Sequence, residues 1–388
     1  STVTSPDGKT VVFNAVGYLW RKELPAGRPQ RITAGTDFEF EPSFSRDGKS
    51  LVYTTWNDTA TGAIWKVNLQ GPAKPVRITR AKGIYRLPSF SPDGHQIVFR
   101  KEDDDPILGP AHTAKPGIYL VSSEGGKESL VTERGDLPAF NSTGDRIFYQ
   151  LGGGMNRNFA SCKLNGEDEH IHFKSTYGSQ FTVSPDEKWI AFVDLWEVYI
   201  AAFPRTGRTI DLGSGTKDFP VKIVSKDAGI ALHWSDDSRQ LHYTLGNQYY
   251  SINLEERFEF IANKPDSAFR IPEKGMDIGL ELPADKPAGM IAFTHARIVT
   301  MKGTEVIENG TVLVEGNLIR AIGNVSKIER GLSKSEHPLA AQVIHKIKSR
   351  EALYVAMLLH DIAKGTERDH SEEGEDIARA LGPRLGLS

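Results

Sequence analysis

Four side chains near the C-terminal end of the 388-residue chain have types and a spacing that could support hydrolytic chemistry. His360 and Asp361 are adjacent, Lys364 follows within one helical turn, and His370 lies six residues beyond that lysine. Imidazole and carboxylate groups are ligands of divalent metals, and a lysine ammonium group attracts phosphate. A lone His-Asp pair is more often structural, so two interpretations stay open at this point: a metal-dependent site and a pair that only stabilises the fold.

Predicted helices on both sides of the pair would position it. Residues 351–364 include an apolar run, which predicts a buried helix that ends near the pair. Pro338 can open an earlier helix, and Ser371 is a good N-cap for a later one that Gly382-Pro383 would end. An imidazole and a carboxylate at the end of an apolar helix are costly to bury unless they are paired or bound to a metal.

The strings around the pair carry a family resemblance. "EHPLA", "REALYVAMLLHDIAKG", "DHSEEG" and "PRLGLS" occur in this order between residues 318 and 388. Together they closely resemble the HD phosphohydrolase domain of the bifunctional uridylyltransferases and uridylyl-removing enzymes, which modify the nitrogen-regulatory PII protein. The resemblance implies a small all-α domain, a PII-type partner and metal-dependent removal of uridylyl groups.

The same resemblance assigns roles to individual residues. His360, Asp361 and His370 match metal ligands, for manganese, magnesium or zinc, and Lys364 matches the lysine that follows the pair. The family's early histidine is replaced by Asn317, and its late aspartate would lie beyond the last residue. An amide oxygen is a poorer ligand for transition metals, so we expect the metal to bind weakly.

An internal repeat occupies the first 262 residues. A Ser-Pro-Asp-Gly-type turn precedes an apolar run six times, and the equivalent third positions of the turn are 40, 46, 50, 43 and 51 residues apart. These positions are Asp7, Asp47, Asp93, Thr143, Asp186 and Asp237. The four residue types suit a type I turn, and the spacing suits one four-stranded blade per repeat.

The repeats resemble TolB-like six-bladed propellers, whose units carry the F-S-P-D-G turn that is intact here at residues 90–94. The resemblance implies a propeller over residues 1–262 with an unknown ligand. The chain lacks an initial Met and the first unit begins at its turn, so we expect missing N-terminal sequence and an incomplete first blade. The segment Ala268–Ile271 is the candidate for closing that blade.

A strand segment follows in residues 263–323, after a linker. Its Asn309-Gly310 and Gly316-Asn317 pairs are hairpin-turn signals. "ARIVTM", "VIENGTVLVEGN" and "AIG" resemble the N-terminal β-sandwich segment of metal-dependent amidohydrolases, which act on C–N bonds. No His-x-His pair and no barrel follow in this chain, so we expect no amide hydrolysis, and we expect some apolar surface that is exposed or rests on the propeller.

One His-x-His sequence does occur, inside the fourth repeat. Alternation along a strand would place His170 and His172 on one face, where they could bind a metal. The other interpretation, which we favour, is a solvated strand edge.

Composition limits the remaining classes of function. The chain has 47 Lys plus Arg against 50 Asp plus Glu and a net charge of −3, which disfavours a nucleic-acid partner. No apolar run approaches the ~20 residues that span a bilayer, so we expect no membrane association. Cys162, the single cysteine, cannot form an internal disulfide.

The sequence therefore predicts a mainly β chain with a six-bladed TolB-like propeller (1–262), a short β-sandwich segment (263–323) and a partial helical HD domain (324–388). The two resemblances meet at Arg320–Gly323, a string that both families accommodate, so a natural fusion and an assembly error both stay open. We expect a hydrolase-derived chain that is weakly active or inactive; the alternative is a non-catalytic binding scaffold. The propeller implies export to the periplasm, whereas the HD part implies the cytoplasm.

Overall fold

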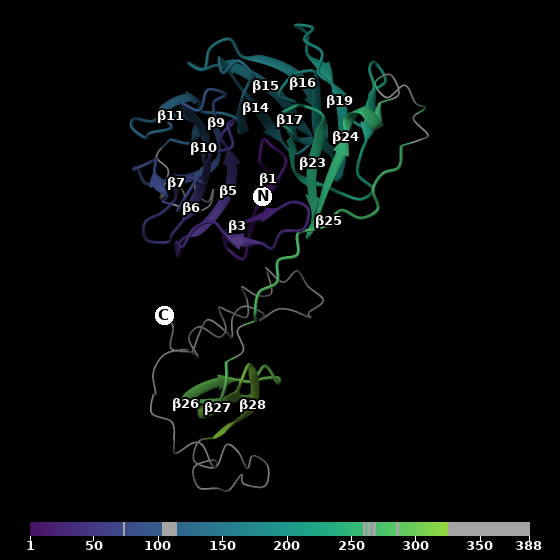
Figure 1. Cartoon of the computed structure of the whole chain (residues 1–388). Helices are drawn as coiled ribbons and strands as arrows, with labels where there is room; N and C mark the ends of the chain where they lie inside the picture. The colour runs from purple at the N-terminus through teal and green to yellow at the C-terminus, as the bar shows by residue number, and fades with distance from the viewer. Residues whose placement is uncertain are drawn as a thin grey trace. The chain divides into compact units, whose positions relative to one another are not determined.

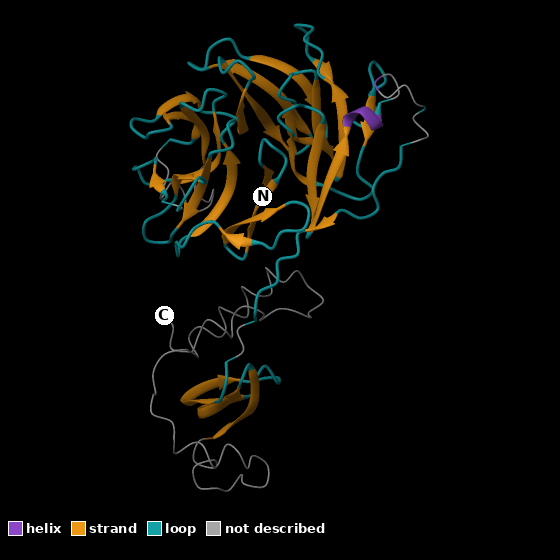
Figure 2. Cartoon of the chain, in the orientation of Figure 1, coloured by secondary structure: helices purple, strands orange, loops and turns teal. Residues whose placement is uncertain are grey.

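The computed structural model describes residues 1–72, 74–102, 115–258, 261, 265, 269–284 and 287–324. The chain divides into two compact units, Ser1–Glu281 and Leu282–Ser388. Strands dominate the described residues of both units (Figure 2). The helices predicted after residue 324 lie outside the described residues.

Six sheets, each with four antiparallel main strands, form the first unit and are arranged around a common centre (Figure 1). The first three blades consist of β1 (Thr2–Thr4), β2 (Thr10–Ala15), β3 (Tyr18–Glu23) and β4 (Gln30–Arg31); β5 (Phe38–Phe44), β6 (Ser50–Trp56), β7 (Ala63–Asn68) and β8 (Val76–Arg77); β9 (Ile84–Phe90), β10 (Gln96–Glu102), β11 (Gly117–Ser122) and β12 (Ser129–Thr132). The next three consist of β13 (Asp136–Phe140), β14 (Arg146–Gly153), β15 (Asn156–Lys163) and β16 (His170–Ser175); β17 (Gly178–Val183), β18 (Trp189–Asp194), β19 (Glu197–Ala202) and β21 (Val221–Ile223); β22 (Ile230–Trp234), β23 (Gln240–Leu245), β24 (Gln248–Asn253) and β25 (Met276–Asp277). The short strand β20 (Ile210–Asp211) adds to blade four in parallel with β16. The predicted six-bladed TolB-like architecture is confirmed.

The first strands of neighbouring blades contact one another and so line the centre. β1 contacts β5, β5 contacts β9, and β9 contacts β13; on the other side β17 contacts β22, which contacts β1. Buried apolar side chains fill the space between adjacent blades. Val52 and Ile64 of blade two, for example, pack with Tyr85 and Phe99 of blade three. The core is therefore a series of interblade layers.

The repeated turn has one hydrogen-bond pattern in five of the blades. The serine hydroxyl donates to the aspartate two residues later at 2.5–2.7 Å, and in the first blade it also accepts from the Thr10 amide at 2.9 Å. The Ser5 hydroxyl and the Lys9 amide lower the pKa of Asp7 below its usual value. Blade four replaces the pair with Asn141 and Thr143, whose side chains both bond to Asp145. These local bonds explain why the motif marks each blade.

The expectation of an incomplete first blade is wrong. β1 pairs with β2 along Thr2–Thr4, so the three residues before the first turn already form the innermost strand. Phe269–Ile271 form no strand, and Ala268 lies outside the described residues. The sixth blade is completed by β25, which pairs with β24 beyond residue 262. Each blade therefore takes its four main strands from one continuous stretch of chain.

The segment after β25 packs on the first blade. Ile278 is buried with Val11, Phe13 and Trp20 of that blade. The ammonium group of Lys22 donates to the carbonyl oxygens of Asp277 at 2.8 Å and of Ile278 at 3.0 Å. Lys22 is only 6% exposed, so these two carbonyl oxygens accept the hydrogen bonds that water would accept from an exposed lysine.

One antiparallel sheet of three strands forms the described part of the second unit: β26 (Met290–Val299), β27 (Val306–Glu315) and β28 (Leu318–Asn324). Ala292 and Leu313 are buried on one face. Ile291 and Ile319 are 51% and 66% exposed, in line with the first of the two predicted alternatives, exposed apolar surface.

Only one of the two predicted hairpin turns in this sheet is correct. Gly316-Asn317 joins β27 to β28. Asn309-Gly310 instead lies inside β27, where Asn309 adopts a left-handed φ of 53° at a bulge. A Cβ atom at Gly310 would come within 2.5 Å of the end of the Ile298 side chain, so a larger residue there would displace that side chain. The same dipeptide chemistry thus serves a bulge as well as a turn.

The described residues include one short helix, α1 (Leu254–Arg257), capped by the Asn253 side chain. No helix in the described part of the chain is long and apolar enough to cross a membrane.

Candidate functional site

A cavity of about 320 Å³ opens at the centre of the propeller, on the face that carries the six repeated turns. Every blade contributes to its lining. The lining includes Thr4 and Pro6, Phe44 and Arg46, Phe90 and Pro92, Phe140 and Asn141, Phe181 and Glu187, and His233 and Asp236. This cavity, the channel mouth, combines apolar rings with a few polar groups, which is the usual composition of a ligand site.

Two blades depart from the turn motif at its fourth position. Blades one to four have glycine there, with φ between 71° and 77°, whereas blades five and six place Glu187 at 53° and Ser238 at 61°. A left-handed conformation costs a residue with a side chain of order 1 kcal/mol. Both side chains make interblade contacts. The Ser238 hydroxyl accepts from the Asp186 amide at 2.9 Å.

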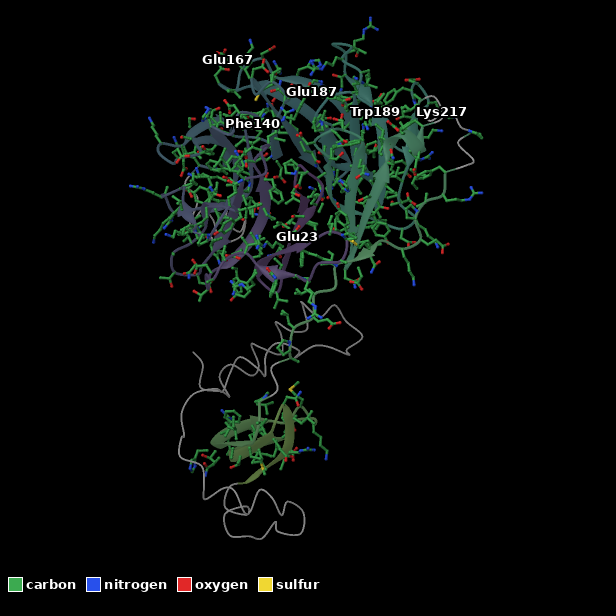
Figure 3. The ribbon with its side chains drawn as sticks, viewed as in Figure 1. Glu23, Phe140, Glu167, Glu187, Trp189 and Lys217 are labelled. Atoms are coloured by element: carbon green, nitrogen blue, oxygen red, sulfur yellow. The ribbon has the colours of Figure 1, made fainter. Side chains whose placement is uncertain are left out.

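The side chain of Glu187 is only 5% exposed. Its carboxylate accepts from the Ser142 amide at 2.7 Å and forms an ion pair with Arg205. Figure 3 labels Glu187 and Phe140, which line the same cavity from blades five and four. The contacts of Glu187 fix the two turns against each other at the edge of the channel mouth.

An ion pair spans the opposite edge. Arg46 Nε lies 3.5 Å from Asp236 Oδ1, and the two side chains are 53% and 42% exposed. An exposed pair of this kind contributes roughly 0–1 kcal/mol, so it shapes the rim more than it stabilises the ring.

A second hollow of about 400 Å³ lies beside blades four and five. We call it the blade four–five groove; its polar lining includes Arg146, His170, His172, Arg205 and Arg208. It shares Asn141, Phe148 and Glu187 with the channel mouth, so the two hollows adjoin.

The two histidines lie on one face of β16 as predicted, with ring centroids 4.6 Å apart. The expected solvated strand edge is wrong for His172, which is half-buried against Phe148 and Phe203. Burial, followed by the nearby charges of His170 and the arginines, lowers the pKa of His172 to about 4. Among the described residues, no three His, Cys, Asp or Glu side chains come together as a metal-binding group.

Ser161 and His172 form a serine–histidine contact in this groove, with Oγ 2.9 Å from Nε2. Ser161 is only 1% exposed, and its hydroxyl also accepts from Arg146 Nε at 3.1 Å. A nucleophile must reach its substrate, and a base with a pKa near 4 withdraws protons poorly at neutral pH. This pair is suited to holding the groove in shape and not to attack on a substrate.

The predicted metal ligands His360, Asp361 and His370 and the predicted catalytic Lys364 lie outside the described residues. Asn317, at the place of the family's early histidine, is exposed in the turn between β27 and β28. The sequence analysis missed Glu187 and Arg205. The signal for Glu187 was available, because S-P-D-E breaks the S-P-D-G motif.

Comparison with protein families gives a match at the C-terminal end, where residues 334–387 fit the family model described as "HD domain". The bifunctional uridylyltransferase/uridylyl-removing enzyme of Novosphingobium aromaticivorans is 58% identical over 60 residues, which are 16% of this chain and 7% of that enzyme. The enzyme of the same description from Rhodospirillum rubrum is 55% identical over 60 residues, again 16% of this chain, and 6% of that enzyme. The chain thus spans less than a tenth of the length of these relatives.

Comparison with solved structures gives a match for the propeller. A putative TolB from Agrobacterium tumefaciens has a TM-score of 0.50 and 19% sequence identity, over 63% of this chain and 90% of that chain. At that identity the likeness concerns the fold alone. The chain therefore joins a TolB-like propeller to an HD-type segment.

Proposed function

We propose that this chain is a binding propeller fused to an HD phosphohydrolase-type segment of the uridylyl-removing kind, and that the segment is weakly active or inactive. The observation that carries the proposal is the HD match over residues 334–387, together with 58% identity to a uridylyl-removing enzyme across 60 residues. The partner of the segment would be a uridylylated PII-type protein.

In this proposal His360, Asp361 and His370 hold a divalent metal, which is manganese, magnesium or zinc. The bound metal would supply an activated water and neutralise phosphoryl charge. Lys364 would contact a phosphoryl oxygen of the uridylyl group.

Weak binding of the metal follows from Asn317. This residue is in a β-hairpin turn, so the early ligand position belongs to a sheet edge and offers only an amide. Losing a ligand typically weakens such a site by an order of magnitude or more.

The strand segment adds no second hydrolase site in this proposal. His295, its sole histidine, has Nδ1 2.7 Å from the Asn309 side-chain oxygen, inside the bulge. We therefore expect no amide or lactam hydrolysis by the chain.

A non-catalytic scaffold is the second candidate, and the channel mouth favours it. That cavity receives side chains from all six blades, as a shared ligand site would. On this candidate the propeller would be exported and would bind its ligand without chemistry, whereas the uridylyl-removing candidate would act in the cytoplasm.

The test is to load the purified full chain with manganese and to measure UMP release from uridylylated PII. We expect little or no UMP, with metal bound weakly and lost in His360→Ala. His95→Ala, which changes an exposed histidine of the propeller, is the matched control and should leave the metal content unchanged. Robust turnover abolished by His360→Ala would show a complete site and overturn the weak-activity proposal. Metal content equal in His360→Ala and the parent chain would overturn the ligand assignment.

A further inference from the structure

The blade four–five groove has hydrogen-bond donors that neither the fold nor the proposed function uses. Its wall holds Arg146 and His172 on blade four, and Phe203, Arg205 and Arg208 on the chain that leaves blade five. Which of these charges are already paired decides what the groove can bind.

Two of the arginines have carboxylate partners. Arg146 donates to the Asp168 carboxylate at 2.7 Å and to the Ser161 and Asp168 carbonyl oxygens. Arg205 forms an ion pair with Glu187 through one terminal nitrogen, which leaves its other N–H groups free to donate.

A third carboxylate, Asp145, is occupied within its own turn. It accepts from Asn141 at 2.7 Å and from the Thr143 hydroxyl. The carboxylates of the groove are therefore all committed to partners on the protein.

The remaining donors have no hydrogen-bond partner among the described residues, and His170 lies near enough to Asp168 to help lower the pKa of that carboxyl. The guanidinium group of Arg208 makes no ion pair or hydrogen bond there, and the ring nitrogens of His170 make no hydrogen bond there. An arginine fork beside a histidine N–H can donate several hydrogen bonds to one anion.

The charges that line the groove are balanced in number. Arg146, Arg205 and Arg208 stand against three carboxylates, Asp145, Asp168 and Glu187. Of the three arginines, only Arg208 has no carboxylate partner among the described residues. Donors without a partner, and not net charge, therefore favour an anion in this groove.

We infer that the blade four–five groove binds a small tetrahedral oxyanion of the phosphate class, held by Arg208, His170 and the free N–H groups of Arg205. A phosphate offers several oxygens in different directions, which suits donors from two blades better than a single planar carboxylate does. This inference goes beyond the proposed function and does not depend on the HD segment.

The experiment uses the full chain in EDTA, so that a metal-dependent phosphate site in the HD segment is silent. Inorganic phosphate is titrated at constant ionic strength while the ring C–H signals of the histidines are followed by NMR. The signal that is missing from the spectrum of His170→Asn is assigned to His170. We expect a saturable shift of the His170 signal with phosphate and a much smaller one with acetate at matched ionic strength.

Two variants locate the binding site. Arg208→Gln should weaken phosphate binding at least about tenfold, because it removes an unpaired charge from the groove. Arg239→Gln, which changes an exposed arginine on blade six, should leave the affinity unchanged. His360→Ala should also leave it unchanged, which separates this result from any failure of the uridylyl-removing proposal.

Three outcomes would overturn the inference. The first is an absence of saturable shift, and the second is an equal response to acetate, which would indicate ionic strength alone. The third is phosphate binding that survives Arg208→Gln or disappears in His360→Ala, because the anion would then bind elsewhere.

Discussion

The Nε2 atom of His233 lies 2.8 Å from the hydroxyl oxygen of Thr4, although 229 residues separate them. His233 Nδ1 donates to the Ala231 carbonyl at 2.8 Å, so in the neutral ring Nε2 accepts the Thr4 hydroxyl proton. The Thr4 oxygen in turn lies 2.7 Å from the Tyr249 hydroxyl, which is 2.9 Å from His242 Nδ1. Side chains therefore close the ring between blade six and blade one, where no strand is exchanged.

This closure makes stability depend on pH. Burial lowers the pKa of His233 to about 4, below its usual 6.5. Between about pH 6.5 and pH 4, His233 is protonated in the unfolded chain and neutral in the folded chain. The free energy of unfolding should therefore fall as pH falls through this range. For one histidine the slope is about 1.4 kcal/mol per pH unit. The measurement is the free energy of unfolding in urea at pH 7, 6 and 5.

The matched variants isolate the contribution of this histidine. The lowered pKa values of His172 and His242 add to the same slope. His233→Asn should therefore reduce the slope of the free energy of unfolding by the share of one histidine, whereas His95→Asn, at an exposed position, should keep it. An unchanged slope in His233→Asn would contradict the assignment. The turn aspartates contribute in a different range, because their pKa values are lowered and their effect is lost only below about pH 4.

Removing the Lys22 ammonium group should weaken the contact between blade one and the segment after β25. Lys22→Met leaves the Asp277 and Ile278 carbonyls without their donor, which should cost about 1–3 kcal/mol in the free energy of unfolding. Lys49→Met, at a side chain that is 55% exposed, is the control and should change stability little. Equal urea midpoints for the two variants would show that the bonds to the segment after β25 contribute nothing.

The hairpin between β2 and β3 should be improved by asparagine. Val16 adopts a φ of 52° while 71% exposed, and Gly17 follows it. A β-branched residue is strained in that conformation, and Asn-Gly is the preferred pair for such a turn. Val16→Asn should raise the free energy of unfolding by about 1 kcal/mol.

A second exposed valine provides the comparison. Val76→Asn, on strand β8 at a residue that is 54% exposed, should have no stabilising effect, because asparagine is disfavoured in strands. A lower melting temperature for Val16→Asn than for the parent chain would refute the strain argument.

The repeated turn predicts a coupled change in stability and acidity. Ser91→Ala removes the hydroxyl that donates to Asp93 and accepts from the Gln96 amide, which should cost about 1 kcal/mol. The pKa of Asp93 should rise, because the Ser91 hydroxyl is the largest cause of its lowering. Carboxyl NMR titration measures this, with Asp47 in the same variant as the internal control. A constant Asp93 pKa would contradict the bond.

The blades were predictable because their signal is local. The Ser-Asp hydrogen bond, the tight turn and the apolar runs lie within a few residues of one another, so each repeat can be recognised as a sheet from its own sequence. β1 escaped prediction because Thr2–Thr4 is too short to show alternation. The hairpin turn predicted at Asn309-Gly310 was wrong because the backbone preference of this pair fits both a turn and a bulge.

The groove and the closing junction could not be predicted in the same way. His233 and Thr4 meet only after six blades have been arranged in a ring, and no local pattern encodes that contact. Glu187 was the exception, since its departure from glycine was visible in the repeat, but its partner Arg205 came from a loop without a pattern.

The contiguity of the blades determines when the propeller can be finished during synthesis. The four main strands of each sheet can pair soon after they leave the ribosome, because they lie close together in the sequence. The bonds from Lys22 to Asp277 and Ile278 span more than 250 residues, so they must wait for almost the entire first unit. Until then the apolar side chains of the first blade that later cover Ile278 stay uncovered, and the nascent chain is most open to aggregation in that interval.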